Sequence, residues 1–95
     1  MEITTTMVRF RFLKEAMKKR TDKAQLFLLA DNQKVWVPLN KCEIKEDEED
    51  SNYNVVTMPK WLYLKGDLPY FTDPVEFVVT SEITEEQLRN NSSYL

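Results

Sequence analysis

The sequence predicts a β-rich α+β domain, either a small five- to six-stranded antiparallel sheet or a partly open barrel, with one or two short helices. Three observations lead to this fold class. Polar and apolar residues alternate near the N-terminus, and an almost continuous apolar run follows. Further short strand-like segments then recur up to about position 80, and the segments with helix-boundary signals are short.

The first predicted strand is the segment TTTMVRFRF, residues 4–12. Its side chains alternate between two faces, which is typical of a strand with one buried and one exposed side. The face predicted to be buried carries Val8, Phe10 and Phe12, and the exposed face carries Met7, Arg9 and Arg11. Residues 13–23, LKEAMKKRTDK, follow as either a short helix or a charged loop.

A β-hairpin is predicted next. Residues 24–30, AQLFLLA, are apolar at nearly every position, which fits a strand buried on both faces. Asp31 and Asn32 supply a tight turn, because asparagine tolerates a positive φ angle. Residues 34–37 return as the second strand. Pro38 has no N–H to donate, so it should end the strand, lie on an edge or mark a bulge.

The C-terminal half is predicted to contain strands at residues 41–44, 54–58 and 75–80, the last with Val75, Phe77 and Val79 facing inward. Between the last two, PKWLYLKG predicts a helix over residues 59–65, with proline at its first position and Gly66 in a positive-φ cap. This helix should press Trp61, with Leu64 or Leu62, onto the sheet. Residues 84–87 form a capping-box motif.

The chain is expected to form one domain. Its core should span residues from about 4 to 80, and residues 81–95 should form a short capped helix and a frayed tail. The chain has 95 residues, of which 42% are hydrophobic and 12% aromatic. That is enough apolar material for a single core.

The composition argues against most catalytic chemistry. Histidine is absent, Cys42 is the single cysteine, and Gly66 is the single glycine. These counts exclude a structural zinc site and a glycine-rich phosphate loop. They also leave the chain without histidine, the commonest general base. We therefore expect a protein that is not an enzyme and has no catalytic residue, metal or cofactor. The lone cysteine suits the reducing cytoplasm of a bacterial host cell, and no membrane segment is expected.

Charge is distributed unevenly along the chain. Residues 1–41 contain nine Lys or Arg against four Asp or Glu, a balance of +5. Residues 42–95 contain four against twelve, a balance of −8, and the net charge is −3. This asymmetry permits a basic surface on an acidic protein, unless the two halves cancel by lying side by side.

Two landmarks in the sequence belong to a wider pattern. The first is V-W-V-P, formed by Val35, Trp36, Val37 and Pro38. The second is V-x-x-P-x-W-L-x-x-K-G, formed by Val56, Pro59, Trp61, Leu62, Lys65 and Gly66. With the acidic linker between them, they resemble small uncharacterised proteins encoded by bacteriophages and prophages. The resemblance covers residues 24–66 and implies a mobile-element origin, with an accessory role near recombination or replication.

Trp36 is the central candidate for a binding residue, and two interpretations are open. It is either packed beneath the helix that carries Trp61, or exposed as a stacking platform. In the second case it would share a face with Arg9 and Arg11 and hold single-stranded nucleic acid. The basic run adds Lys18, Lys19 and Arg20 as candidate contacts to nucleic acid or a protein partner, although a solvated helix face explains the run as well.

An acidic run offers a second candidate surface. It consists of Glu46, Asp47, Glu48, Glu49 and Asp50. A solvated loop is the simpler interpretation, and the run lacks the ligand spacing and glycine of a calcium loop. As a functional alternative, a carboxylate string imitates nucleic-acid phosphates and could occupy a basic groove on another protein.

Two hypotheses about function follow. In the first, the protein is a small non-enzymatic binding protein of phage or mobile-element origin, accessory to DNA metabolism, that contacts nucleic acid or a DNA-handling protein. In the second, it is a phage-encoded inhibitor that binds a host defence protein through the acidic loop and the tail. Self-association is also expected if Pro38 marks an exposed edge strand.

Overall fold

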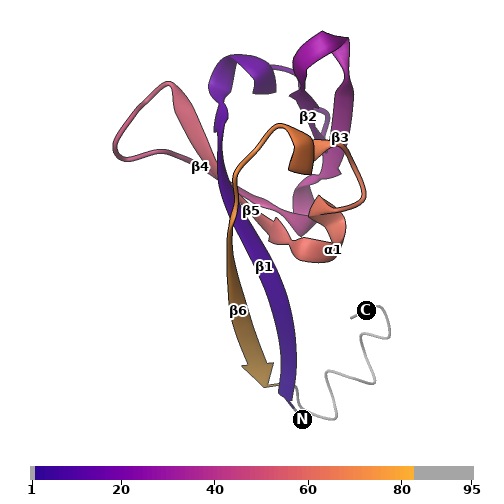
Figure 1. Ribbon diagram of the computed structural model, residues 1–95, viewed down its shortest axis with the longest axis vertical. Helices are drawn as coiled ribbons and strands as arrows, with labels where there is room; N and C mark the ends of the chain where they lie inside the picture. The colour runs from indigo at the N-terminus through magenta and orange to yellow at the C-terminus, as the bar shows by residue number, and fades with distance from the viewer. Residues whose placement is uncertain (1, 83–95) are drawn as a thin grey trace.

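The computed structural model describes residues 2–82, which form six strands and one short helix (Figure 1). The strands are β1 (Glu2–Leu13), β2 (Ala24–Leu28), β3 (Lys34–Pro38), β4 (Glu43–Glu46), β5 (Tyr53–Pro59) and β6 (Val75–Glu82). The helix is α1 (Lys60–Tyr63), and 3-10 turns occupy Lys14–Met17, Ala30–Asn32, Leu39–Lys41 and Leu68–Tyr70. The predicted capping box and tail lie outside the described residues.

The strands divide between two sheets. An antiparallel sheet has the order β4-β5-β1-β6, and β2 and β3 form a separate antiparallel hairpin. The predicted β-rich character is therefore confirmed. The arrangement is neither one continuous sheet nor a closed barrel, because the hairpin packs against a face of the larger sheet as a second layer.

The core lies between these two layers. Val8, Phe10 and Phe12 of β1 are buried as the alternation predicted, while Arg9 and Arg11 point to solvent. The Phe27 ring of β2 lies 6.3 Å from that of Phe10 and 5.1 Å from that of Phe12, measured between centroids. Further core residues from both layers are Met17, Leu29, Val37, Val56, Met58, Tyr63 and Leu68.

The hairpin follows most of its sequence signals. Asn32 has a φ angle of 65° and makes the turn, and β3 ends at Pro38 as expected. Residues 14–17, where the sequence left a helix or a loop open, form a 3-10 turn that buries Met17. In β2, Leu28 is exposed, so this strand is covered on both faces only over Gln25, Leu26 and Phe27.

Three predictions about the helix are wrong, and the first two concern its start and its buried face. Pro59 does not open the helix, because it still belongs to β5 and pairs with Met7 in the sheet. Trp61 and Leu64 are not pressed onto the sheet: they are 46% and 57% exposed, and Tyr63 is buried. Leu62, the alternative to Leu64, does pack against the core. A four-residue helix buries only one narrow face, and the Tyr63 hydroxyl fixes that face by a 2.5 Å hydrogen bond to Thr72.

The third error concerns Gly66, which does not have a positive φ angle. The structure gives a different reason for glycine at this position. A Cβ atom built there would lie 3.2 Å from Cγ1 of Val35 and 3.4 Å from Cγ2. The segment after α1 thus packs closely against β3, and glycine is the residue that permits this approach.

The inward face predicted for residues 75–79 is also wrong. β6 pairs with β1 in a register that places Phe77 opposite Met7 and Val75 opposite Arg9. Val75, Phe77 and Val79 therefore share the outer face with Arg9, and Val75 is 68% exposed. Alternation alone identifies two faces of a strand, and the register of its neighbour decides which of them meets the core.

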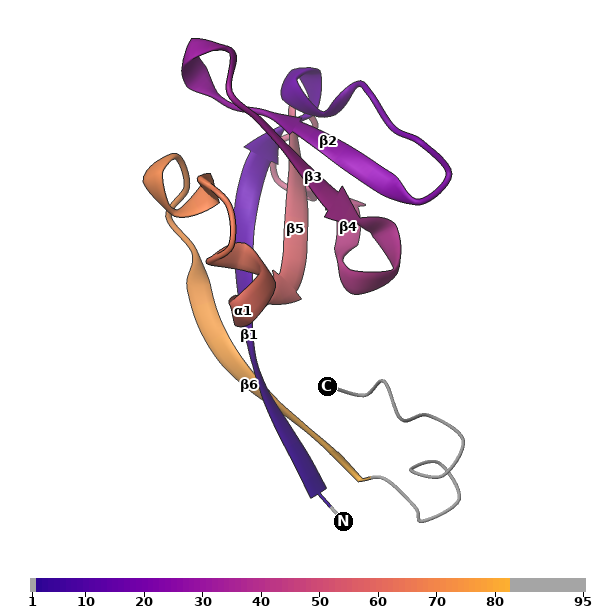
Figure 2. The same cartoon turned by 90° about the vertical axis from the view of Figure 1, so that its right-hand side faces the viewer.

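One end of the large sheet narrows to a two-stranded ribbon. β5 pairs with β1 only from Met7 onward, whereas β6 pairs with β1 from Glu2 to Arg9. β1 and β6 therefore continue past α1 and away from the hairpin layer (Figures 1 and 2). This arrangement exposes side chains on both faces of the ribbon.

Candidate binding surfaces

The outer face of the four-stranded sheet carries Arg9 and Arg11, each held by an aromatic ring. The Arg9 guanidinium lies 4.7 Å from the centre of the Phe77 ring, and its Nε donates a 3.3 Å hydrogen bond to Thr57 Oγ1. The Arg11 guanidinium lies 4.5 Å from the centre of the Tyr53 ring. Cation–π contacts of this kind fix the guanidinium groups flat against the sheet.

The acidic run is an ordered connection between β4 and β5, and Asp47 holds it to the sheet. The Asp47 carboxylate lies 2.5 Å from Arg11 Nε and accepts a 3.0 Å hydrogen bond from the backbone N–H of Glu49. Asp50 accepts a similar bond from the backbone N–H of Asn52. Glu46 still belongs to β4 and pairs with Lys14 at 2.6 Å, whereas Glu48 and Glu49 are exposed on the turn that Asp47 and Asp50 fix.

These contacts change the titration of Asp47. The backbone N–H of Glu49, together with the nearby Arg11 guanidinium, lowers the pKa of the Asp47 carboxyl below its ordinary value. A carboxylate with a lower pKa in the folded protein than in the unfolded chain stabilises the fold above its unfolded pKa. That contribution is lost as the pH falls through the folded pKa.

We therefore expect Asp47→Asn to lower the free energy of unfolding at neutral pH and to change it less in strong acid, where the parent carboxyl is also uncharged. Urea unfolding across an acid pH series measures this difference in the free energy of unfolding between the variant and the parent. Glu48→Gln, on the same turn and exposed, is the matched control and should follow the parent curve. Parallel curves for Asp47→Asn and the parent at every pH would contradict the assignment.

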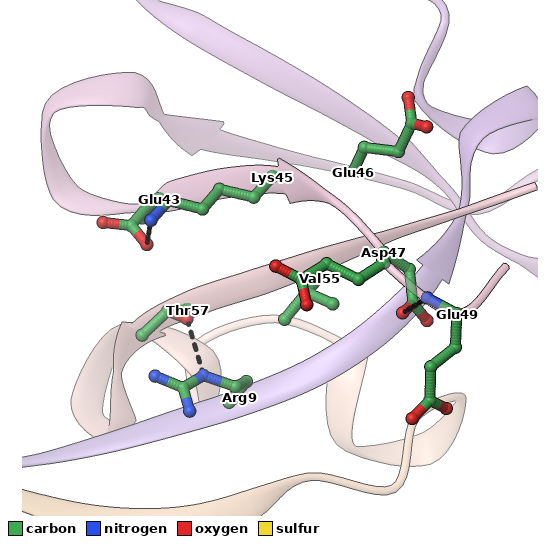
Figure 3. Close-up of a pocket in the computed structure, with 9 residues that line it drawn as sticks. Arg9, Glu43, Lys45, Glu46, Asp47, Glu49, Val55 and Thr57 are labelled. Carbon is green, nitrogen blue, oxygen red and sulfur yellow. Dashed lines mark hydrogen bonds and ion pairs between the residues drawn. The ribbon is translucent and has the colours of Figure 1, made fainter. Parts of the chain in front are cut away.

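A shallow hollow of about 380 Å³ lies beside Arg9, between β5 and the acidic turn (Figure 3). Its charged lining consists of two cations, Arg9 and Lys45, and five carboxylates, those of Glu43, Glu46, Asp47, Glu48 and Glu49. Lys45 is itself paired with Glu43 at 3.4 Å. The excess of carboxylates makes this side of the molecule unfavourable for a phosphate group.

The outer face of the β2-β3 hairpin has the opposite character. Trp36 is 50% exposed on this face and pairs with Leu26 in the hairpin register. Lys34, two residues before Trp36, lies on the same face. The backbone of Lys19 lies along the other edge of β2, where its carbonyl accepts a 3.0 Å hydrogen bond from the N–H of Leu26. Lys19 and Trp36 are thus separated by two strand spacings, roughly 10 Å.

Gln25 fixes the basic run to this hairpin. Its side chain is buried, and its amide nitrogen lies within hydrogen-bond distance of three carbonyls: those of Met17 at 2.7 Å, Leu26 at 2.9 Å and Lys19 at 3.1 Å. Its amide oxygen accepts a 3.0 Å bond from Arg20 Nε. One buried amide therefore determines where the segment from residue 17 to residue 20 runs.

The structure separates the residues that the sequence grouped together. Trp36 is not packed beneath α1, and it does not share a face with Arg9 and Arg11. Trp36 lies on the outer face of the hairpin, with Lys18, Lys19 and Arg20 exposed beside β2. The two arginines lie on the outer face of the other layer, next to the acidic turn. The core separates the two surfaces.

Three residues of these surfaces were missing from the sequence-based predictions, and of these only Gln25 carried a signal. Phe77 and Tyr53 meet the arginines only through the registers of β6 and β5 with β1. Gln25 interrupts an otherwise apolar run, and a polar residue in such a run is a signal that a buried hydrogen-bond network is present.

Cys42 lies in a partly buried environment. Burial raises the pKa of the Cys42 thiol, so the reactive thiolate is a minor species at neutral pH. Within residues 2–82, no group of three His, Cys, Asp or Glu side chains is placed to hold a metal ion. No helix of this part of the chain has the length and apolar character needed to span a bilayer.

Comparison of the chain with known protein families, with curated proteins and with solved structures finds no match.

Proposed function

We propose that this protein is a small, non-enzymatic binding protein of phage or mobile-element origin, accessory to DNA metabolism in the cytoplasm of a bacterial host. In this proposal it contacts single-stranded nucleic acid through the outer face of the β2-β3 hairpin. The observation that carries the proposal is the half-exposed indole of Trp36 on a face bordered by exposed lysines. An aromatic ring stacks with bases of any sequence, and lysines beside it follow the phosphates.

The charges of the hairpin layer support this assignment. Residues 18–41 contain six cations, Lys18, Lys19, Arg20, Lys23, Lys34 and Lys41, against two carboxylates, Asp22 and Asp31. The carboxylates of residues 46–50 belong to the other layer. The molecule is therefore polarised, which would orient it toward a polyanion despite a net charge of −3.

The proposed origin rests on the V-W-V-P and V-x-x-P-x-W-L-x-x-K-G landmarks. The two landmarks are in contact, because Gly66 of the second packs against Val35 of the first. Pro38 and Pro59 end β3 and β5, respectively. The shared pattern therefore describes one packed unit that presents Trp36 outward, and this is the feature we connect with function.

The test is a titration of labelled single- and double-stranded oligonucleotides at low and moderate salt. We expect the single strand to bind, with an affinity that falls as salt rises, because bound lysines release counterions. Trp36→Ala should weaken binding by about tenfold or more, since a base–aromatic stack contributes about 1–3 kcal/mol. Lys19→Gln should weaken binding less and reduce the salt dependence.

Arg11→Gln is the matched control, because Arg11 lies across the core and is already paired with Asp47. Its affinity should equal that of the parent. No binding at low salt would refute the proposal, and loss of binding in Arg11→Gln but not in Trp36→Ala would move the site to the other face.

The acidic turn supports a second candidate function, a phage-encoded inhibitor of a host defence protein. The specific observation is that Asp47 and Asp50 fix the turn through backbone hydrogen bonds, so that Glu48 and Glu49 are displayed at defined positions. A preordered carboxylate surface would suit a basic groove on another protein. Neutralising Glu48 and Glu49 should then abolish inhibition and leave oligonucleotide binding unchanged.

A further inference from the structure

β1 has a free edge beside α1. Its residues 2–6 pair with β6 on one side. On the other side, β5 ends at Pro59 opposite Met7, so no strand among residues 2–82 continues the ladder. A strand edge of this kind presents backbone N–H and C=O groups that are free to pair with another extended chain.

A groove of about 600 Å³ lies between this edge and α1. Its apolar lining comes from Ile3, Pro59, Trp61 and Leu64. Its two large exposed side chains are Trp61 of α1 and Leu64, the residue directly after α1, and both are about half exposed. Exposed apolar side chains next to an open strand edge are typical of sites that accept a peptide strand.

The charged side chains of the groove are cationic. Lys41 and Lys60 line it, and no carboxylate among the side chains that the structure describes does. Lys60 is paired with Glu76 at 2.5 Å, and Lys65 Nζ lies 5.1 Å from the centre of the Trp61 ring. The acidic turn precedes Tyr53, which pairs with Leu13 at the other end of β1 from residues 3–6. Acidic side chains of a ligand would therefore meet the positive charges of Lys41 and Lys65 next to α1.

We infer that this groove binds an extended segment of a partner protein, which carries apolar and acidic residues together on the face that it turns toward α1, as an additional strand on the edge of β1. Its backbone would pair with residues 3–6. Its apolar side chains would lie against Trp61 and Leu64, and its acidic ones would lie near Lys41 and Lys65. A nucleic acid has no backbone able to complete a β-ladder, so this surface differs in kind from the Trp36 face.

The site goes beyond the proposed contact with nucleic acid and does not depend on it. It adds a protein partner on another part of the molecule, so a failure of either test leaves the other result unaffected.

The experiment uses the full chain with Trp36→Phe, which leaves Trp61 as the only tryptophan. The probe is a synthetic eight-residue peptide in which every second residue is threonine and the positions between are valine and glutamate in turn, so that valine and glutamate share one face of the strand. We expect a saturable change in Trp61 fluorescence, together with shifts of the backbone amide signals of residues 3–6 in NMR spectra. Leu64→Glu should weaken binding by about tenfold or more, because it places a like charge beside the peptide and removes an apolar contact.

Two peptide controls separate the parts of the inference. A peptide with lysine in place of glutamate should bind about tenfold more weakly if the groove selects by charge. A peptide N-methylated at alternate residues, on the edge that faces β1, cannot donate to the strand and should not bind. Equal affinity for either control, or no binding of the parent peptide, would overturn the inference.

Self-association is measured in parallel by sedimentation of the free protein. If the protein forms a dimer that Leu64→Glu dissociates, the groove is occupied by a second copy, and the assignment to a foreign segment is wrong. A monomer that binds the glutamate peptide supports the inference.

Discussion

Phe27→Ala is expected to lower the free energy of unfolding by about 3–5 kcal/mol, the range for removal of a buried phenylalanine ring. Phe27 is completely buried, and its ring joins the hairpin layer to Phe10 and Phe12 of the large sheet. Its loss leaves a cavity at the junction of the layers, which neither sheet fills alone. Domains of this size are typically stable by about 5–15 kcal/mol, so the variant should be near its unfolding threshold.

Urea unfolding followed by circular dichroism measures the change. Phe71→Ala removes the same ring at an exposed position and should change the free energy of unfolding by less than about 1 kcal/mol. A comparable loss for both variants would show that ring size, and not the junction between the layers, accounts for the effect.

Gln25→Leu is expected to lower the free energy of unfolding by about 2–4 kcal/mol, although leucine is similar in size and more apolar. The substitution leaves the carbonyls of Met17 and Leu26 without the Gln25 donor, and each unsatisfied group costs about 1–3 kcal/mol. It also frees the segment from residue 17 to residue 20 from β2. Hydrogen exchange at the N–H of Leu26, which donates to Lys19, should therefore accelerate beyond the change in global stability.

Gln25→Glu distinguishes lost hydrogen bonds from altered packing. At neutral pH the introduced carboxylate keeps its contact with Arg20 Nε, but it faces the carbonyl oxygens of Met17 and Leu26 and cannot donate to them, so the variant should still be less stable than the parent. Burial should raise the pKa of this carboxyl, and protonation restores a donor, so stability relative to the parent should recover as the pH falls. Gln33→Leu, at an exposed position, should be nearly neutral. Equal stability of Gln25→Leu and the parent would contradict the role of Gln25.

Most strands could be predicted from the sequence because their signals are local. Alternation in residues 4–12 separates the buried phenylalanines of β1 from its arginines, and Asn32 and Pro38 limit the hairpin. The candidate residues Lys18, Lys19 and Trp36 could also be identified from their types. Their grouping with Arg9 and Arg11 could not, because it depends on how two sheets are layered.

The errors arise where a decision depends on a neighbour distant in the sequence. The residues of α1 have no period long enough to select a buried face, and Tyr63 is buried because Thr72 bonds its hydroxyl. Val75 faces outward because β6 pairs with β1 in a register set by the whole ribbon. Gly66 serves close packing against Val35 and not a positive φ angle, a distinction that only the approach of β3 makes.

The sequence by itself determined the β-rich class, the hairpin turn, the two-faced first strand and the separation of basic and acidic charge along the chain. These features depend on backbone preferences and on side-chain periodicity within a few residues. The tertiary structure alone decided that the arginines face the acidic turn, that Trp36 lies on the opposite surface, and that β1 keeps an open edge beside Trp61. The physical reason is that strand register and layer packing are set by contacts between distant segments, where burial of the shared core outweighs local preference.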